Sequence, residues 1–190
     1  FKPYAACHLT HPSVDAAKAA LASLKLKDIR KVRAHVFPLA EQITGRRDGR
    51  PATGLAGKFD IRYCIAATLH GNTLSAADFA DPWKPAPDML ALAAGIEVVP
   101  DATQNFGSAR LELELTNGST RSETIEVARG HPGNPLQWSD MKGKFEGLVA
   151  PVLGRQWEPL LATVRRFGES GTLASLKTQL KALSSGSPSA

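Results

Sequence analysis

The strict alternation of residues 109–115 constrains the fold more than any other segment of this chain. Residues 110–115 read Arg-Leu-Glu-Leu-Glu-Leu. Because successive side chains of a β-strand point to opposite faces, one face of this segment carries leucine and the other carries charge. A strand of this kind is typical of a sheet with one buried face and one face that is wet or covered by another domain.

A β-hairpin is expected directly after this strand. The dipeptide Asn-Gly follows the strand, and residues 120–127 then carry a second strand pattern. A two-residue loop would place Leu111 opposite Thr124, whereas a three-residue loop through Ser119 would place Leu111 opposite Ile125. The match between hydrophobic side chains favours the three-residue loop.

The remaining periodicities predict both strands and helices. Two further strands are expected at residues 29–36 and 96–101, and helices at residues 12–26, 55–69 and 88–94. The C-terminal third predicts three more helices, the first capped by Ser139, followed by a Ser/Gly/Pro tail over residues 184–190 that is expected to be disordered. We therefore expect an α+β fold over residues 1–183, a two-layer sandwich whose antiparallel sheet of about four strands packs against helices on one face.

Composition excludes several classes of protein. The net charge is +5, but the basic residues are dispersed and only 6% of residues are aromatic, so no nucleic-acid partner is expected. No apolar run approaches the roughly 18 residues of a membrane span, and no basic-then-apolar pattern typical of a signal peptide occurs, so neither is expected. The two cysteines, Cys7 and Cys64, form no Cys-x-x-Cys motif and are expected to be reduced. These features predict a cytoplasmic protein that does not bind membranes.

A dense group of polar and ionisable side chains lies ahead of the helix predicted from residue 12. Its members are Lys2, Tyr4, Cys7, His8, Thr10 and His11. A helix N-terminus keeps a neighbouring imidazole neutral and attracts carboxylates. His11 is therefore expected to act as a base near pH 7, with Lys2 holding an anion or donating a proton. The residues alone leave open the alternative of a structural histidine and a solvated lysine.

No metal or cofactor is expected in this chain. His8 and His11 are three residues apart, but no further metal ligands lie nearby in the sequence, and no nucleotide-binding motif is present. Arg46 and Arg47 lie in a Gly/Pro-rich loop, where they form either a solvated turn or a clamp for an anionic substrate.

Four motifs along the chain point to a known family. They are Phe1-Lys2-Pro3-Tyr4-x-x-Cys7-x-x-Thr10-His11-Pro12-x-x-Asp15-Ala16, Lys58-Phe59-x-x-x-Tyr63, Ala128-Arg129-Gly130-x-Pro132, and Lys144-Phe145. Together they resemble the MmgE/PrpD family, which includes 2-methylcitrate dehydratase, cis-aconitate decarboxylase and iminodisuccinate epimerase. Members combine a large helical first domain with a smaller α+β second domain, and the active site lies in the cleft between them. The resemblance implies that this chain is the second domain without the helical N-terminal domain.

The resemblance also implies a chemistry and a set of site residues. The family removes a proton next to a carboxylate of a small di- or tricarboxylate without a cofactor, and lyases and isomerases of this type differ in the step that follows. Lys2 matches the active-site lysine and His11 the histidine of the same segment, whereas Tyr63 is expected to be structural. The residues expected to bind substrate are His8, Thr10, Tyr4, Arg46 and Arg47.

Within the family, a dehydratase similar to 2-methylcitrate dehydratase is favoured. The tyrosine that cis-aconitate decarboxylase carries after its first strand has no match in residues 37–53. A homodimer is expected for the full-length protein, and the isolated second domain is expected to be inactive. The alternative is a non-catalytic binding or assembly module that docks a partner chain through its exposed sheet face and leader.

Overall fold

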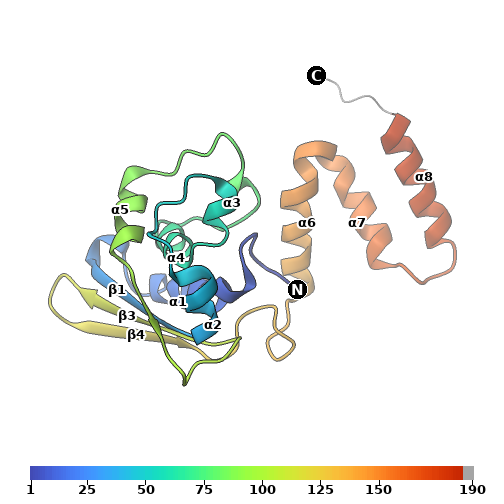
Figure 1. Cartoon of the computed structure of the whole chain (residues 1–190). Helices are drawn as coiled ribbons and strands as arrows, with labels where there is room; N and C mark the ends of the chain where they lie inside the picture. The colour runs from blue at the N-terminus through green and yellow to red at the C-terminus, as the bar shows by residue number, and fades with distance from the viewer. Residues whose placement is uncertain (186–190) are drawn as a thin grey trace. The chain divides into compact units, whose positions relative to one another are not determined.

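The computed structural model describes residues 1–185, which form two compact units. The first unit is Phe1–Leu136, coloured blue to yellow in Figure 1, and the second begins at Gln137, with its described residues, 137–185, coloured orange to red. The domain expected over residues 1–183 spans both units. Helix α8 (Thr172–Ser185) includes the first two residues of the expected disordered tail, and the other five lie outside the described residues.

A four-stranded sheet in the order β2-β1-β3-β4 forms one layer of the first unit. The strands are β1 (Ile29–Val36), β2 (Glu97–Pro100), β3 (Ala109–Leu115) and β4 (Thr120–Ile125). The α+β class is confirmed, but the sheet is mixed rather than purely antiparallel, because β2 pairs in parallel with β1. Between these two strands the chain crosses over through helices, and such a crossover returns it in the same direction.

The β3–β4 hairpin has a register different from the one predicted. Leu111 lies opposite Glu123, two residues from the expected partner Ile125. The loop comprises residues 116–118: Leu115 N donates to Ser119 O at 2.8 Å, and Gly118 closes the turn with a φ of 82°. Pairing hydrophobic side chains across the hairpin did not predict the register correctly, because β4 is a largely exposed edge strand. A shift of two residues keeps each side chain on the same face of the sheet.

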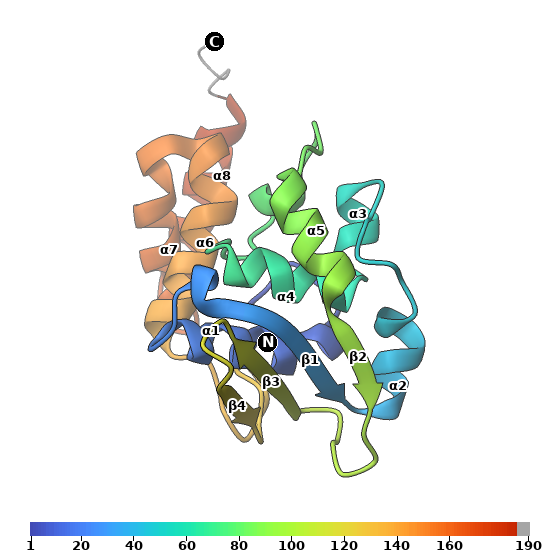
Figure 2. The same cartoon turned by 90° about the vertical axis from the view of Figure 1, so that its left-hand side faces the viewer.

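Helices cover one face of this sheet and form the second layer, as Figure 2 shows. They include α1 (His11–Leu21), α4 (Ile61–Leu69) and α5 (Pro87–Gly95). The largest wholly buried side chains of the core between the layers include Tyr63, Ile61, Ile65, Leu74, Leu111, Leu113, His11, Val14, Val32 and Val36. Shorter helical turns are His8–Thr10, Leu26–Asp28, α2 (Pro38–Ala40), the π-helix Glu41–Gly45, α3 (Gly54–Gly57) and Ala77–Phe79.

The single helix predicted over residues 55–69 is broken into α3 and α4. Asp60 lies at the break with only 1% of its surface exposed, and its carboxylate caps α4 by accepting hydrogen bonds from Arg62 N and Tyr63 N. The same carboxylate accepts a third bond from Gly49 N at 3.1 Å. Burial, the largest cause, raises the pKa of Asp60. Apolar residues recur at helical spacing on both sides of the break, so the sequence pattern did not indicate the cap at Asp60.

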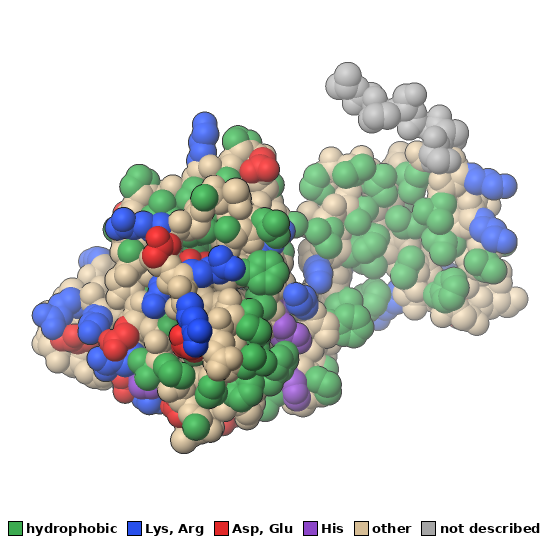
Figure 3. Space-filling view, viewed as in Figure 1, with side chains coloured by type: hydrophobic (Ala, Val, Ile, Leu, Met, Phe, Trp, Pro, Cys, Tyr) green, Lys and Arg blue, Asp and Glu red, His purple; other side chains and the backbone are tan. Residues whose placement is uncertain are grey.

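The opposite face of the sheet carries a network of charged side chains. Glu112 accepts hydrogen bonds from His35 at 3.0 Å, Arg33 at 3.2 Å and Arg110 at 2.7 Å. The bond from His35 is the largest cause that lowers the pKa of Glu112 to about 2. Figure 3 shows basic and acidic side chains mixed around the sheet, at the left of the view. The alternation of β3 therefore separates a leucine face from a face of ion pairs.

The described residues of the second unit, 137–185, form three helices, α6 (Trp138–Leu153), α7 (Trp157–Arg165) and α8, with the short turn Gly154–Gln156 before α7. Gln137 rather than the predicted Ser139 is the N-cap of α6, because Asp140 reaches back to the main-chain N–H of Gln137 at 2.8 Å. Large apolar side chains of this unit remain exposed, among them Leu148, Val152, Phe167, Leu173 and Leu180.

Candidate active site

The first ten residues form an ordered leader that is built into the core of the first unit. Ala5 N donates to Leu74 O at 2.8 Å, and Cys7 N donates to Lys58 O at 2.7 Å. Tyr4 and Ala6 are buried and belong to the hydrophobic core. Because main-chain bonds hold the leader to two separate loops, its side chains have defined positions.

Lys2 and His11, the two residues predicted to be catalytic, converge on one main-chain atom. Lys2 Nζ donates to Ala6 O at 3.1 Å, and His11 Nε2 lies 3.3 Å from the same oxygen. A carbonyl oxygen only accepts hydrogen bonds, so Nε2 of His11 carries the hydrogen. His11 has an exposed surface of 0%, whereas Lys2 is exposed. In this arrangement Lys2 is open to solvent and His11 supports the leader from within.

The imidazole of His8 is half-buried, in contrast to the wholly buried imidazole of His11. Its ring lies 4.9 Å from the ring of His11 and 5.3 Å from the ring of Phe106, the latter in an edge-on geometry. Burial is the largest cause that lowers the pKa of His8, and the positive charge of Lys2 is the next. A histidine with a lowered pKa is neutral near pH 7 and is able to accept a proton.

Tyr4 and Thr10, predicted to bind substrate, use their hydroxyl groups inside the protein. The Tyr4 hydroxyl donates to the Asp15 carboxylate, which also accepts from Arg129 N at 2.7 Å. Burial, followed by the charge of Asp15, raises the pKa of Tyr4 far above its ordinary value. The Thr10 hydroxyl donates to Cys7 O at 2.8 Å and is wholly buried. Both hydroxyls hold the leader in place.

A turn after β4 lies against the leader and contributes residues that sequence reasoning did not assign to the site. The main-chain nitrogen of Phe1 donates to Gly130 O at 2.9 Å. A Cβ atom at Gly130 would lie 2.1 Å from Phe1 O, and the φ of Gly130 is 87°, so the close approach requires glycine. His131 follows directly and lies close enough to His8 that its ionised form would lower the pKa of His8. The motif around Gly130 was the only sequence signal for this contact.

Arg46 and Arg47 lie at the end of the π-helix Glu41–Gly45 and are exposed. Arg46 Nε lies 3.4 Å from Glu41 Oε1, and Arg47 Nε donates to Phe59 O at 3.1 Å. Phe59 follows Lys58, whose carbonyl group accepts from the leader. Arg47 is thus bonded to the residue next to Lys58, which holds the leader, whereas Arg46 pairs with Glu41 of its own helix.

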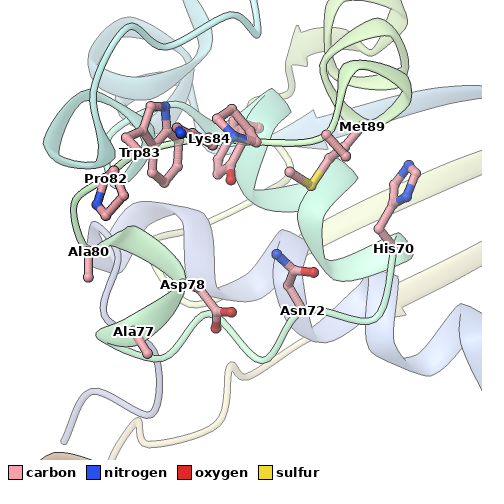
Figure 4. A pocket seen from close by; sticks show the side chains of 12 residues that line it. His70, Asn72, Ala77, Asp78, Ala80, Pro82, Trp83, Lys84 and Met89 are labelled. Atoms are coloured by element: carbon pink, nitrogen blue, oxygen red, sulfur yellow. The ribbon is translucent and has the colours of Figure 1, made fainter.

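A separate pocket of about 420 Å³ lies beside the end of α4, and none of the residues predicted for the site lines it. Figure 4 shows His70 and Met89 on one side of this pocket and Trp83 and Pro82 on the other. Tyr63 also lines the pocket and packs against Trp83, with ring centres 5.1 Å apart. Burial raises the pKa of Tyr63 to about 12. Tyr63 therefore acts here as a buried aromatic side chain.

Other features bear on cysteine, metal and membrane chemistry. Cys7 and Cys64 are both free, and burial raises the pKa of the Cys64 thiol. Within residues 1–185, no group of three or more His, Cys, Asp or Glu side chains is arranged to hold a metal ion. Every helix in the same range is too short or too polar to span a lipid bilayer.

Comparison with known proteins identifies the family of the chain. No curated protein matches it. The family model described as the MmgE/PrpD C-terminal domain matches residues 4–166, which include the leader from Tyr4 onward but not Lys2, the sheet and its helices, and α6 and α7. That match covers most of the 190 residues. The chain therefore belongs to the MmgE/PrpD C-terminal domain family.

Proposed function

We propose that the leader is one wall of the active site of a cofactor-independent lyase or isomerase that acts on a small di- or tricarboxylate. The observation that carries the proposal is that the positive charge of Lys2, an exposed ammonium group that donates to Ala6 O, acts on His8 and helps burial to lower the pKa of this imidazole. A neutral base next to a fixed cation suits proton removal beside a carboxylate. The cation stabilises the negative charge that develops on that carboxylate.

The proposal gives a role to residues of the leader and to residues outside it. His8 accepts the proton from the substrate. Lys2 binds the carboxylate that is attached to the carbon losing this proton. His11 is a positioning residue, because its ring backs that of His8 and its Nε2 is engaged by Ala6 O. Tyr4 remains protonated and holds the leader through Asp15. Arg47 is a candidate for a second substrate carboxylate, and Arg46 is a weaker one because Glu41 pairs with it.

Dehydration in the manner of 2-methylcitrate dehydratase is the favoured outcome, in a cytoplasmic enzyme. The helical domain that the family resemblance implies would form the opposite wall of the cleft and supply a general acid that protonates the leaving hydroxyl group, so that it departs as water. A homodimer of the complete enzyme is part of the same proposal.

Activity assays with and without a helical domain test this proposal. The chain alone and the chain combined with an MmgE/PrpD helical N-terminal domain are each given 2-methylcitrate, cis-aconitate and iminodisuccinate. Turnover is expected only in the combined sample, and Lys2→Met should reduce it by at least about a hundredfold. Turnover by the chain alone would contradict the need for a second wall. If a folded complex turned over none of these three compounds, the proposed substrate class would be wrong.

A second candidate function is the docking of a partner chain without catalysis. It is favoured by the exposed apolar side chains of the second unit, among which Val152 is 78% and Phe167 is 62% exposed. Sedimentation of the purified chain and binding of an apolar dye test this candidate. A strictly monomeric protein that binds no dye would count against docking.

A further inference from the structure

The turn at residues 128–134 presents His131 in a fixed orientation. Gly130 N donates to Asn134 O at 2.8 Å, and Asn134 N donates back to His131 O at 2.9 Å. Gly133 N donates to His131 Nδ1 at 3.0 Å. Because Nδ1 accepts this bond, the hydrogen of the neutral imidazole is on Nε2. His131 therefore offers an N–H donor whose tautomer is set by the backbone of its own turn.

Two independent contacts bring this turn to the proposed site. On one side, Gly130 O accepts from the main-chain nitrogen of Phe1, the residue before Lys2. On the other side, a Cβ atom built on Gly107 would lie 3.7 Å from Cδ2 of His131, while the neighbouring Phe106 ring contacts His8. His131 and His8 thus flank the same loop, next to the start of the leader.

We infer that His131 binds a carboxylate group of the substrate, together with Lys2 and beside His8. This inference rests on the proposed function and extends it to a residue outside the leader. The Nε2–H of His131 donates one hydrogen bond to the carboxylate, and Lys2 supplies the charge. A hydrogen bond to an ionised carboxylate is stronger than one between neutral groups, so its loss should be measurable as affinity.

The variant His131→Asn tests the inference with little disturbance of the turn. Its side-chain oxygen can accept the bond from Gly133 N in place of Nδ1, while the Nε2–H donor is lost. Citrate serves as the probe and is titrated into the wild-type chain, with binding followed by the NMR signals of the His8 imidazole. The matched control is His35→Gln, a histidine of the charged sheet face that pairs with Glu112.

We expect His131→Asn to weaken citrate binding by about tenfold and His35→Gln to leave it unchanged. Wild-type affinity in a folded His131→Asn variant would overturn the inference and leave the proposed function standing. A wild-type chain whose His8 signals do not respond to citrate would count against the proposed function itself. In the complex with a helical domain, the same variant should raise KM by about tenfold and change kcat little, which a purely structural role would not produce.

Discussion

Lys2 and His11 meet at the carbonyl oxygen of Ala6, at 3.1 and 3.3 Å. The two residues are nine positions apart in the sequence, and the turn of the leader makes this shared contact possible. Because the oxygen accepts from both, the ammonium group of Lys2 is held in place before any substrate binds. This preorganisation is what a site that stabilises developing negative charge requires.

The positive charge of Lys2 is predicted to act on the titration of His8. In Lys2→Met the pKa of His8 should rise, but not to its ordinary value of 6.5, because burial is the larger cause of the lowering. NMR titration of the imidazole signals measures this pKa. Lys27→Met, which removes an exposed lysine of the turn Leu26–Asp28, is the control and should leave His8 unchanged. An unchanged pKa in Lys2→Met would mean that the ammonium group does not act on His8.

The same lowered pKa predicts how stability depends on pH. The unfolded chain binds a proton at His8 more readily than the folded chain does, so the free energy of unfolding should decrease as the pH falls below about 6.5. The decrease should end below the folded pKa. In His8→Gln this part of the pH dependence should be absent, as measured by urea unfolding at a series of pH values.

Gly130 is predicted to be essential for docking the leader. Gly130→Ala adds a Cβ atom 2.1 Å from Phe1 O at a φ of 87°, so the leader has to move. Gly118→Ala is the matched control, since its φ is 82° but its Cβ would have no neighbour within 4 Å. Backbone strain alone should cost Gly118→Ala about 1–2 kcal/mol of unfolding free energy. Gly130→Ala should lose more and also shift the His8 NMR signals; equal losses with unshifted signals would refute this contact.

Asp60 is predicted to be the most important helix cap near the site. Asp60→Ala leaves three main-chain N–H groups without their carboxylate acceptor, and should lower the free energy of unfolding by about 2–3 kcal/mol. Thr53→Ala removes the single, exposed cap bond of α3 and should cost about 1 kcal/mol or less. Thermal or urea unfolding compares the two variants. Similar losses in both would contradict the buried role of Asp60.

Glu112 is predicted to stabilise the folded chain at neutral pH, and this contribution to the free energy of unfolding should be lost in acid. Its folded pKa of about 2 lies below the ordinary 4.5, so the contribution is complete above about pH 4.5 and is lost as the pH falls towards 2. Glu112→Gln should cost about 1 kcal/mol at pH 7, where solvent weakens these ion pairs, and flatten the unfolding curve between these pH values. Glu126→Gln, at an exposed residue after β4, should behave as the wild type. A wild-type acid transition in Glu112→Gln would contradict the network.

Local patterns were sufficient for the elements that each depend on one stretch of chain. The predicted bounds of β1 and β3 agree with the structure, because period-two alternation reports directly which side chains face the core. The family expected from the sequence motifs is likewise confirmed by the family model over residues 4–166, whereas the role of Lys2, which precedes this range, stays a prediction. These features depend on neighbours within a few residues, so the order of amino acids is enough to reveal them.

Contacts between distant segments could not be inferred from such patterns. The parallel pairing of β2, the hairpin register, the cap at Asp60, the burial of His11 and the approach of His131 to the leader all depend on which segments meet in space. Periodicity states which face of an element is apolar, but not what packs against it or which main-chain groups it satisfies. For this chain the sequence was therefore sufficient for the α+β class, the family and the leader. The packing of the core then selected His8 rather than His11 as the accessible imidazole, since burial is a property of the assembled fold.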